Sequence, residues 1–185
     1  MTKRAHIPDR QDETGRYASR EDFCRIFIED LDELYQLSFL LTRDSQKAER
    51  CFVGGVEDCV AGNSVFHEWA LSWARRATIQ NAIRELKPRP SQRNPVSPTV
   101  SADINPLSSG PGQHFEVDAV LRLKDYERFV FVLSVLEHYS EHDCAQLLGC
   151  SVLEIREARS RALNELATSL HMDRSQDEFV VLDKK

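Results

Sequence analysis

The sequence lacks the features that mark secreted, membrane-spanning and disulfide-stapled proteins. Its longest compact apolar run, residues 129–133, is far shorter than the roughly 18 residues of a membrane-spanning helix. The first twenty residues are charged and have no apolar centre, so we expect no secretory signal, no membrane partner and a cytoplasmic location. The five cysteines are odd in number and include no CxxC pair, which argues against a disulfide framework.

Motifs of the common enzyme classes are also missing. The sequence has no GxSxG, HExxH or GxxxxGK(S/T) segment and no GxGxxG segment after a strand. We therefore expect no enzymatic activity and no cofactor. His138 and His142 are four residues apart, but a helix cap at Ser140 would separate their faces, so we also expect no metal site.

The charge balance limits how the chain could bind nucleic acid. With 24 basic and 30 acidic residues, the net charge is −6, which excludes binding by bulk charge. Any contact with nucleic acid must rest on a local basic surface. One basic stretch spans residues 74–93, where six cations outnumber the single acid Glu85 and give a net charge of +5.

Proline divides the chain into two parts. Six of the seven prolines fall within residues 88–111, together with many Ser, Asn and Gln residues, which indicates a linker. We predict a polar N-terminal tail over residues 1–19, a helical domain over 20–87, a linker over 88–115, a second helical domain over 116–172 and a C-terminal tail over 173–185.

Both predicted domains show the three-to-four-residue spacing of helices, so the predicted fold class is all-α. In the first domain, two apolar stripes over residues 23–41 predict a central helix that begins at a capping box of Ser19 and Asp22. Asp44 is expected to cap a second helix. A third helix is predicted over about residues 65–86.

The strongest local signal lies in the second domain. Ser140 is expected to cap a short helix that ends at Gly149 in the left-handed conformation, and Ser151 with Glu154 forms a capping box for the next helix. Two helices joined by a short turn with glycine indicate a helix-turn-helix. The preceding apolar run, residues 129–136, is predicted to be helical, although its β-branched residues would also suit a strand.

Several motifs occur in a characteristic order: residues 34–42 (LYQLSFLLT), Asp44, residues 48–49 (AE), Phe66, Trp69, residues 73–76 (WARR) and residues 139–151 (YSEHDCAQLLGCS). This order resembles a small sigma factor of the sigma-70 family, of the extracytoplasmic-function type. The resemblance covers roughly residues 25–87 and 117–166. It implies a region-2-like helical bundle and a region-4-like helix-turn-helix domain, joined by the proline-rich linker.

The resemblance implies a transcription initiation protein whose partners are RNA polymerase core and promoter DNA. Region 2 of such proteins binds the polymerase clamp and the melted minus-ten element, and region 4 places a helix in the major groove at the minus-thirty-five element. The implied DNA-binding residues are Arg75, Arg76, Arg84, Lys87, Arg156, Ser160 and Arg161. The implied polymerase-binding residues are Glu49, Arg50, Val53 and Gly54.

Two departures from the family pattern support an alternative function. Gly54 and Gly55 replace a Gln-Glu pair, and because two interior glycines cost a helix about 2 kcal/mol relative to alanine, we expect a kink there. The predicted recognition helix is neutral, whereas the family is commonly basic there. The alternative is a degenerate sigma-like regulator that acts by protein–protein contact, for example with an anti-sigma factor, without reading promoters. A third possibility makes residues 117–166 a free-standing helix-turn-helix regulator behind an unrelated helical domain.

Trp69 and Trp73 allow two interpretations. Their indole rings could stack on an unpaired base. However, they share a helical stripe with Phe66 and Ala77, and this periodicity favours packing in the core.

Overall fold

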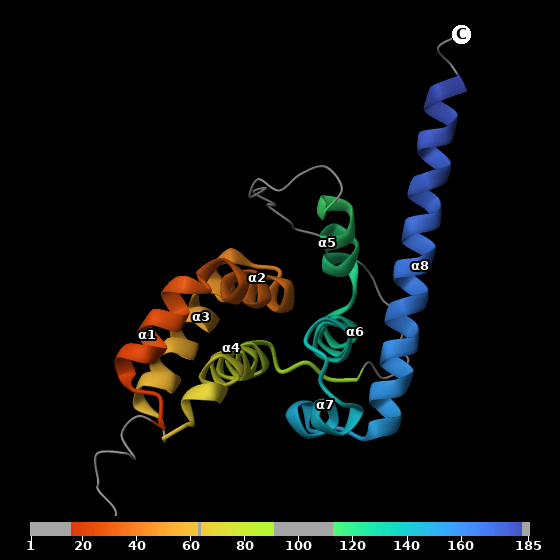
Figure 1. Ribbon diagram of the computed structural model, residues 1–185. Helices are drawn as coiled ribbons and strands as arrows, with labels where there is room; N and C mark the ends of the chain where they lie inside the picture. Colours follow the sequence, from red (N-terminus) through yellow and green to blue (C-terminus); the bar gives the residue numbers. More distant parts are fainter. Residues whose placement is uncertain (1–15, 63, 91–112, 183–185) are drawn as a thin grey trace, which may run out of the picture. The chain divides into compact units, whose positions relative to one another are not determined.

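The computed structural model of the 185-residue chain describes residues 16–62, 64–90 and 113–182. The start of the predicted N-terminal tail, most of the predicted linker and Arg93 lie outside the described residues. The chain divides into two compact units, one within residues 1–39 and 44–85 and the other within residues 40–43 and 86–185. The described residues form helices and no strand, so the predicted all-α class is confirmed (Figure 1). None of these helices is both long and apolar enough to cross a membrane.

The first unit is built from helices that begin at side-chain caps. Its elements are α1 (Arg20–Glu29), α2 (Leu31–Thr42), α3 (Ser45–Ala61), a 3-10 turn (His67–Trp69) and α4 (Ala70–Leu86). At α1, the Ser19 hydroxyl accepts from the Asp22 N–H at 3.1 Å and the Ser19 N–H donates to the Asp22 carboxylate at 2.9 Å. At α3, Asp44 accepts from the Lys47 N–H at 2.8 Å. Both predicted caps are confirmed.

The predicted single helix over residues 23–41 is wrong, because the chain breaks at Asp30. The Asp30 N–H still donates to the Ile26 carbonyl at 2.9 Å, while its own carbonyl accepts from the Leu34 N–H at 3.0 Å. One helix therefore ends and the next begins at this residue, whose backbone angles are φ −103° and ψ 25°. Aspartate favours such boundaries because its side chain competes for backbone hydrogen bonds.

The core of the first unit combines aromatic residues of α1 with small residues of α3 and α4. Its buried members are Phe23, Phe27, Leu34, Cys59, Val65, Ala70, Ala74 and Ala77. Phe27 meets Phe52 of α3 edge to face, with ring centroids 5.3 Å apart. Burial raises the pKa of the Cys51 thiol to about 11 and that of Cys59 to about 12. Both thiols therefore stay protonated and pack as small hydrophobes.

Gly54 and Gly55 lie where α3 packs against α4, and α3 continues through them without interruption. The predicted kink is therefore wrong. A Cβ atom at Gly55 would lie 2.8 Å from the Oγ1 of Thr78 and 3.3 Å from its backbone nitrogen. A Cβ atom at Gly54 would lie 2.5 Å from the Oδ1 of Asn81. The two missing side chains allow a close approach of the helices that offsets the low helix propensity of glycine.

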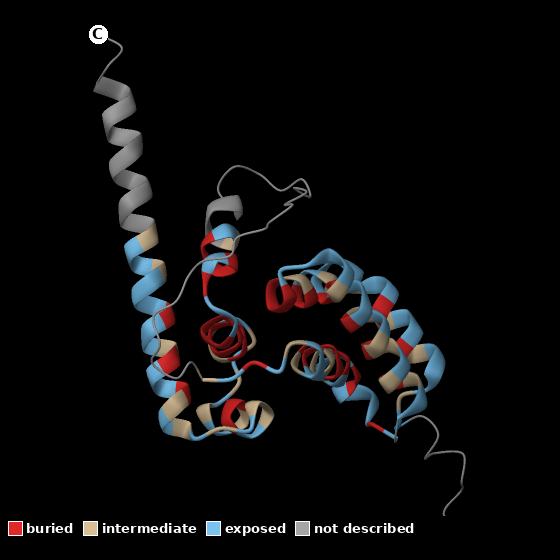
Figure 2. Ribbon diagram, turned by 180° about the vertical axis from the view of Figure 1, so that it is seen from behind, coloured by how far each residue is buried: buried red, intermediate tan, exposed pale blue. Residues whose placement is uncertain are grey.

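The second unit packs its helices around α8. Its elements are α5 (Gln113–Arg122), α6 (Asp125–Phe131), a π-helical turn (Val132–Leu136), α7 (Glu141–Leu148) and α8 (Val152–Leu182). Figure 2 shows buried residues concentrated along α6 and on one side of the first half of α8. Residues 129–136 are helical, so the alternative that they form a strand is wrong. The helix α8 also extends past residue 173, where we predicted the start of the tail.

We predict that Gly55→Ala lowers the free energy of unfolding of the first unit by about 1–2 kcal/mol. Overpacking against the Thr78 backbone should outweigh a gain of about 1 kcal/mol in helix propensity. Urea unfolding followed by circular dichroism measures the change. The matched control is Val53→Ala at an exposed position of the same helix, which should change stability by less than about 0.5 kcal/mol. A Gly55→Ala variant more stable than the wild type would contradict the close approach of α3 and α4.

Candidate nucleic-acid interface

The helices α7 and α8 form a turn-linked pair. Ser140 caps α7 by accepting from the Asp143 N–H at 3.1 Å. Gly149 ends α7 in the left-handed conformation, with φ 66° and ψ 41°. Its N–H donates to the Ala145 carbonyl, which also accepts from the Cys150 N–H at 3.0 Å. The predicted cap and the predicted glycine stop are confirmed, and together they fix where α8 begins.

Ser151 and Glu154 close the N-terminus of α8. The backbone N–H and the hydroxyl of Ser151 each lie 2.8 Å from Oε2 of Glu154, and the Glu154 N–H donates back to the Ser151 hydroxyl at 3.3 Å. The hydrogen bond from the Ser151 backbone, and then that from its hydroxyl, lowers the pKa of Glu154. The predicted capping box is confirmed.

The first half of α8 presents an exposed face. The side chains of Arg156 and Arg161 are 64% and 48% exposed. Ser160 lies between them and is exposed, and Leu153 is exposed in the first turn. The opposite side of the helix is buried. Its buried residues are Ile155, Ala158 and Ala162. The three residues of α8 that the sequence analysis assigned to DNA binding are therefore all accessible to a partner.

Carboxylates from two other helices hold the arginines of this face. The Nε of Arg156 donates to Oε2 of Glu141, in α7, at 2.6 Å. The Nε of Arg161 donates to Oε1 of Glu127, in α6, at 3.1 Å. Glu127 is buried, and its second oxygen has no hydrogen-bond partner among the described residues. The sequence analysis missed both acids, because they lie 15 and 34 residues from their partners along the chain.

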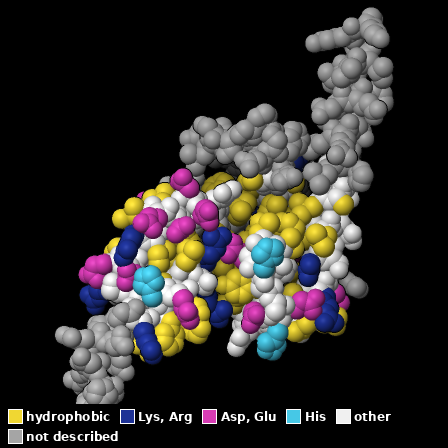
Figure 3. All heavy atoms as spheres, in the orientation of Figure 1, with side chains coloured by type: hydrophobic (Ala, Val, Ile, Leu, Met, Phe, Trp, Pro, Cys, Tyr) yellow, Lys and Arg dark blue, Asp and Glu magenta, His cyan; other side chains and the backbone are white. Residues whose placement is uncertain are grey.

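Ion pairs also neutralise part of the basic stretch in the first unit. Arg75 of α4 lies 3.0 Å from the carboxylate of Glu33 in α2, and Arg84 pairs with Asp58 in α3. The surplus of cations counted along the sequence is therefore smaller in space. Figure 3 shows basic side chains interspersed with acidic ones on the visible face.

Two of the predicted DNA-binding residues remain without an ion pair among the described residues. Arg76 is half-buried in α4, and Lys87 is exposed just after it, with a positive φ of 47°. These two cations are the part of the predicted basic surface that is available to a phosphate without breaking an existing ion pair.

The predicted polymerase contacts lie on α3 but do not all point outward. Glu49, Arg50 and Val53 are exposed, and Arg50 pairs with Glu85 of α4 at 2.6 Å. Gly54 lies instead on the side that packs toward α4. A larger side chain at Gly54 would meet α4 before it could meet a partner.

The aromatic residues expected in the core are exposed. Trp69 is 57% exposed, Trp73 42% and Phe66 38%. Tyr17 stacks on Phe66 with ring centroids 4.8 Å apart, and Phe66 meets Trp69 edge to face at 5.3 Å. The prediction that both tryptophans pack in the core is wrong, and their indole rings form part of an aromatic surface.

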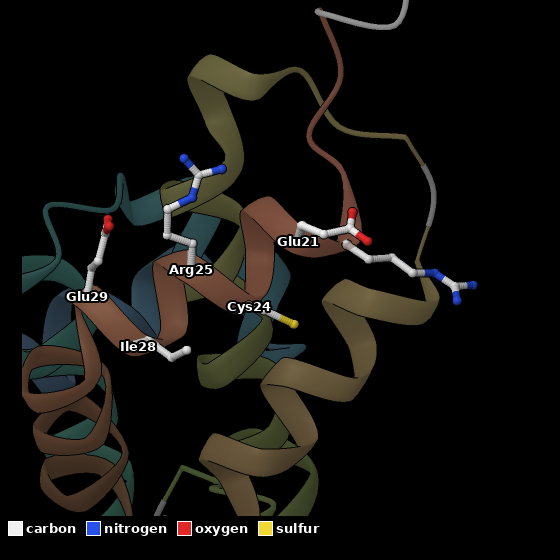
Figure 4. A pocket seen from close by; sticks show the side chains of 6 residues that line it. Glu21, Cys24, Arg25, Ile28 and Glu29 are labelled. Carbon is white, nitrogen blue, oxygen red and sulfur yellow. The ribbon is translucent and has the colours of Figure 1, made fainter.

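A shallow hollow of about 400 Å³ lies along the outer side of α1 (Figure 4). Cys24 and Ile28 contribute to its lining, together with charged residues of the same helix. None of the predicted site residues lines it. Among the residues that the structure describes, no three His, Cys, Asp or Glu side chains are grouped as a metal ion would require.

Comparison with known proteins finds one relevant similarity. No family model and no curated protein gives a significant match to the sequence. Among solved structures, the chain is similar to a chain of the co-crystal structure of the sigma factor RpoE in complex with the anti-sigma factor NepR from Bartonella quintana. The two are 22% identical, the match covers 83% of this chain and 99% of that chain, and the TM-score is 0.47. This similarity is too low to assign a function.

We predict that Trp69→Ala lowers the free energy of unfolding by less than about 1.5 kcal/mol, whereas a tryptophan in a protein core costs about 3–5 kcal/mol. The reason is that more than half of the Trp69 side chain is already in solvent. Urea unfolding followed by circular dichroism measures the loss. The matched control is Ile79→Ala, a fully buried position of the same helix, which should cost about 2–5 kcal/mol. Equal losses in the two variants would contradict the exposure of the indole.

We predict that Ser151→Ala raises the pKa of Glu154 part of the way to its ordinary value, because the hydroxyl is lost while the backbone N–H remains. Since the pKa of Glu154 is lower in the folded than in the unfolded chain, the capping box stabilises the fold above the unfolded pKa of about 4.3. That contribution is lost as the pH falls through the folded pKa. Titration of the carboxyl carbon by nuclear magnetic resonance tests the shift, and Ser140→Ala, which removes the other cap, should leave Glu154 unchanged.

Proposed function

We propose that the chain is a cytoplasmic, non-enzymatic, sigma-like transcription initiation protein that belongs to the sigma-70 family. Its partners are RNA polymerase core and promoter DNA. It binds the minus-ten element through α4 and the minus-thirty-five element through α8. The observation that carries this proposal is the exposed face of α8, which presents Arg156, Ser160 and Arg161 beside the turn of a helix pair.

The chemistry of this face suits the major groove of DNA. An α-helix fits this groove, and residues of its N-terminal half contact base edges. Arginine donates two hydrogen bonds to guanine, and an apolar side chain such as the exposed Leu153 contacts the methyl group of thymine. Ser160 can bond either a base or a phosphate.

The first unit offers chemistry suited to a melted strand. Arg76 and Lys87 can bind phosphates, and the exposed indole rings of Trp69 and Trp73 can stack on unpaired bases. Stacking of a base on an aromatic side chain contributes about 1–3 kcal/mol. The exposed tryptophans thus support the base-stacking role that the sequence analysis had ranked second.

The ion pairs favour a second candidate function. Arg75, Arg84, Arg156 and Arg161 each have a carboxylate partner, which reduces the charge that is available to phosphates. A chain with this surface binds DNA weakly by itself. The second candidate is therefore a sigma-like regulator that acts through protein–protein contact, for example with an anti-sigma factor, and does not read promoters.

Pull-down with core RNA polymerase, followed by in vitro transcription from a library of DNA fragments, tests the proposal. We expect the chain to bind core polymerase and to direct transcription from specific start sites. Arg156→Ala should reduce these specific transcripts by about tenfold, the effect of losing one good contact to a base, without weakening polymerase binding. The matched control is Arg122→Ala, an exposed arginine of α5, which should leave transcription unchanged.

Other outcomes separate the two candidates. Binding to a small partner protein without binding to polymerase would select the second candidate. Binding to polymerase without specific start sites would also count against promoter reading by this chain.

A further inference from the structure

We propose that Glu141 and Glu127 are positioning residues that orient Arg156 and Arg161 for contact with DNA. This inference rests on the proposed function and adds a role to two acids outside α8. A merely neutralising role for the same acids is the competing interpretation, and the two roles predict opposite effects on DNA binding.

The geometry of the pairs distinguishes orientation from simple neutralisation. In both pairs the carboxylate accepts from Nε, at 2.6 Å for Arg156 and 3.1 Å for Arg161. Nε lies on the edge of the guanidinium nearest the backbone, so the terminal Nη1 and Nη2 groups point away from the acid. These two groups can donate in parallel to guanine or to a phosphate.

The terminal groups of Arg156 are available for such a contact. Neither Nη1 nor Nη2 of Arg156 has a hydrogen-bond or ion-pair partner among the described residues, and the side chain is 64% exposed. Glu141 therefore holds this arginine from behind, at the first turn of α7, and leaves its donor end in solvent. An arginine that is already held in place loses less conformational entropy when it binds.

Arg161 is held more firmly because its partner is buried. The side chain of Glu127 is only 4% exposed, and its second oxygen has no hydrogen-bond partner in the part of the chain described. Release of Arg161 would leave a buried carboxylate without its cation, which is strongly unfavourable. The Nη1 of Arg161 lies 3.8 Å from Glu157, which is beyond hydrogen-bond distance. Arg161 can thus keep its bond to Glu127 while its terminal groups contact DNA.

The two roles predict opposite changes when the acid is removed. If Glu141 only cancels charge, its removal raises affinity for every duplex, because a negative charge beside the phosphates is lost. If Glu141 orients Arg156, its removal lowers the preference for the correct sequence. The measured quantity is therefore the ratio of affinities for a selected duplex and a scrambled duplex at one salt concentration.

The experiment uses the full chain bound to core polymerase and duplexes selected from a random library. Glu141→Ala should lower the affinity ratio by about tenfold, within the range expected for one bidentate contact. Glu141→Gln should restore most of the ratio, because its amide oxygen can still accept from Nε. The matched control is Glu165→Ala, an exposed acid of α8 without an ion pair among the described residues, which should leave the ratio unchanged.

A second variant tests the buried pair without emptying the core. Arg161→Lys keeps the charge beside Glu127, but a single ammonium group cannot hold the acid and also make a bidentate contact with DNA. The positioning role predicts that Arg161→Lys lowers the affinity ratio as far as Arg161→Ala does. Circular dichroism of each variant confirms that the fold is retained.

Each remaining outcome has a definite meaning. An unchanged ratio in Glu141→Ala, or equal gains in affinity for both duplexes, would overturn the positioning role and leave the proposed function intact. Wild-type binding without any sequence preference would overturn the proposed function, and the positioning role with it.

Discussion

Pairing between arginines and carboxylates of neighbouring helices controls how this chain can meet a nucleic acid. Four of the arginines that the sequence offers for DNA contact are held in this way, two in each unit. Exposed pairs of this kind contribute only about 0–1 kcal/mol each to stability. Their larger effect is on the surface potential, because a carboxylate within hydrogen-bond distance cancels most of the field of the guanidinium beyond about 10 Å. DNA binding must then depend on direct contacts.

The exposed tryptophans and the two glycines of α3 have a common physical cause. At Gly55 the helices α3 and α4 are so close that an added Cβ atom would lie 3.3 Å from the Thr78 backbone. The buried side of α4 therefore has room for alanines but not for indole rings, and Trp69 and Trp73 lie on its outer side. Periodicity could not reveal this, because both sides of the helix carry apolar residues at three-to-four-residue spacing.

The parts of the structure that were predictable from the sequence depend on residues close together along the chain. A cap and a glycine stop each involve residues only a few positions apart, and all five such signals were confirmed. They are Ser19, Asp44, Ser140, Gly149 and Ser151. The break at Asp30 was missed because apolar spacing continues across it. The acids that hold Arg156 and Arg161 were missed because tertiary packing, and not local sequence, brings them to α8.

A neutral but exposed recognition face is consistent with a protein that reads DNA only when it is tethered. Attachment to a larger assembly raises the effective concentration of a DNA-binding module to the millimolar range for a short flexible linker, so the module needs little affinity of its own. Its contribution is then discrimination between sequences, which depends on arginines held in a fixed orientation more than on net charge. Under the proposed function, the ion pairs of α8 would weaken binding to DNA in general while preserving sequence preference. The neutrality of α8 and the accessibility of Arg156 and Arg161 then have one explanation instead of standing as evidence for opposite functions.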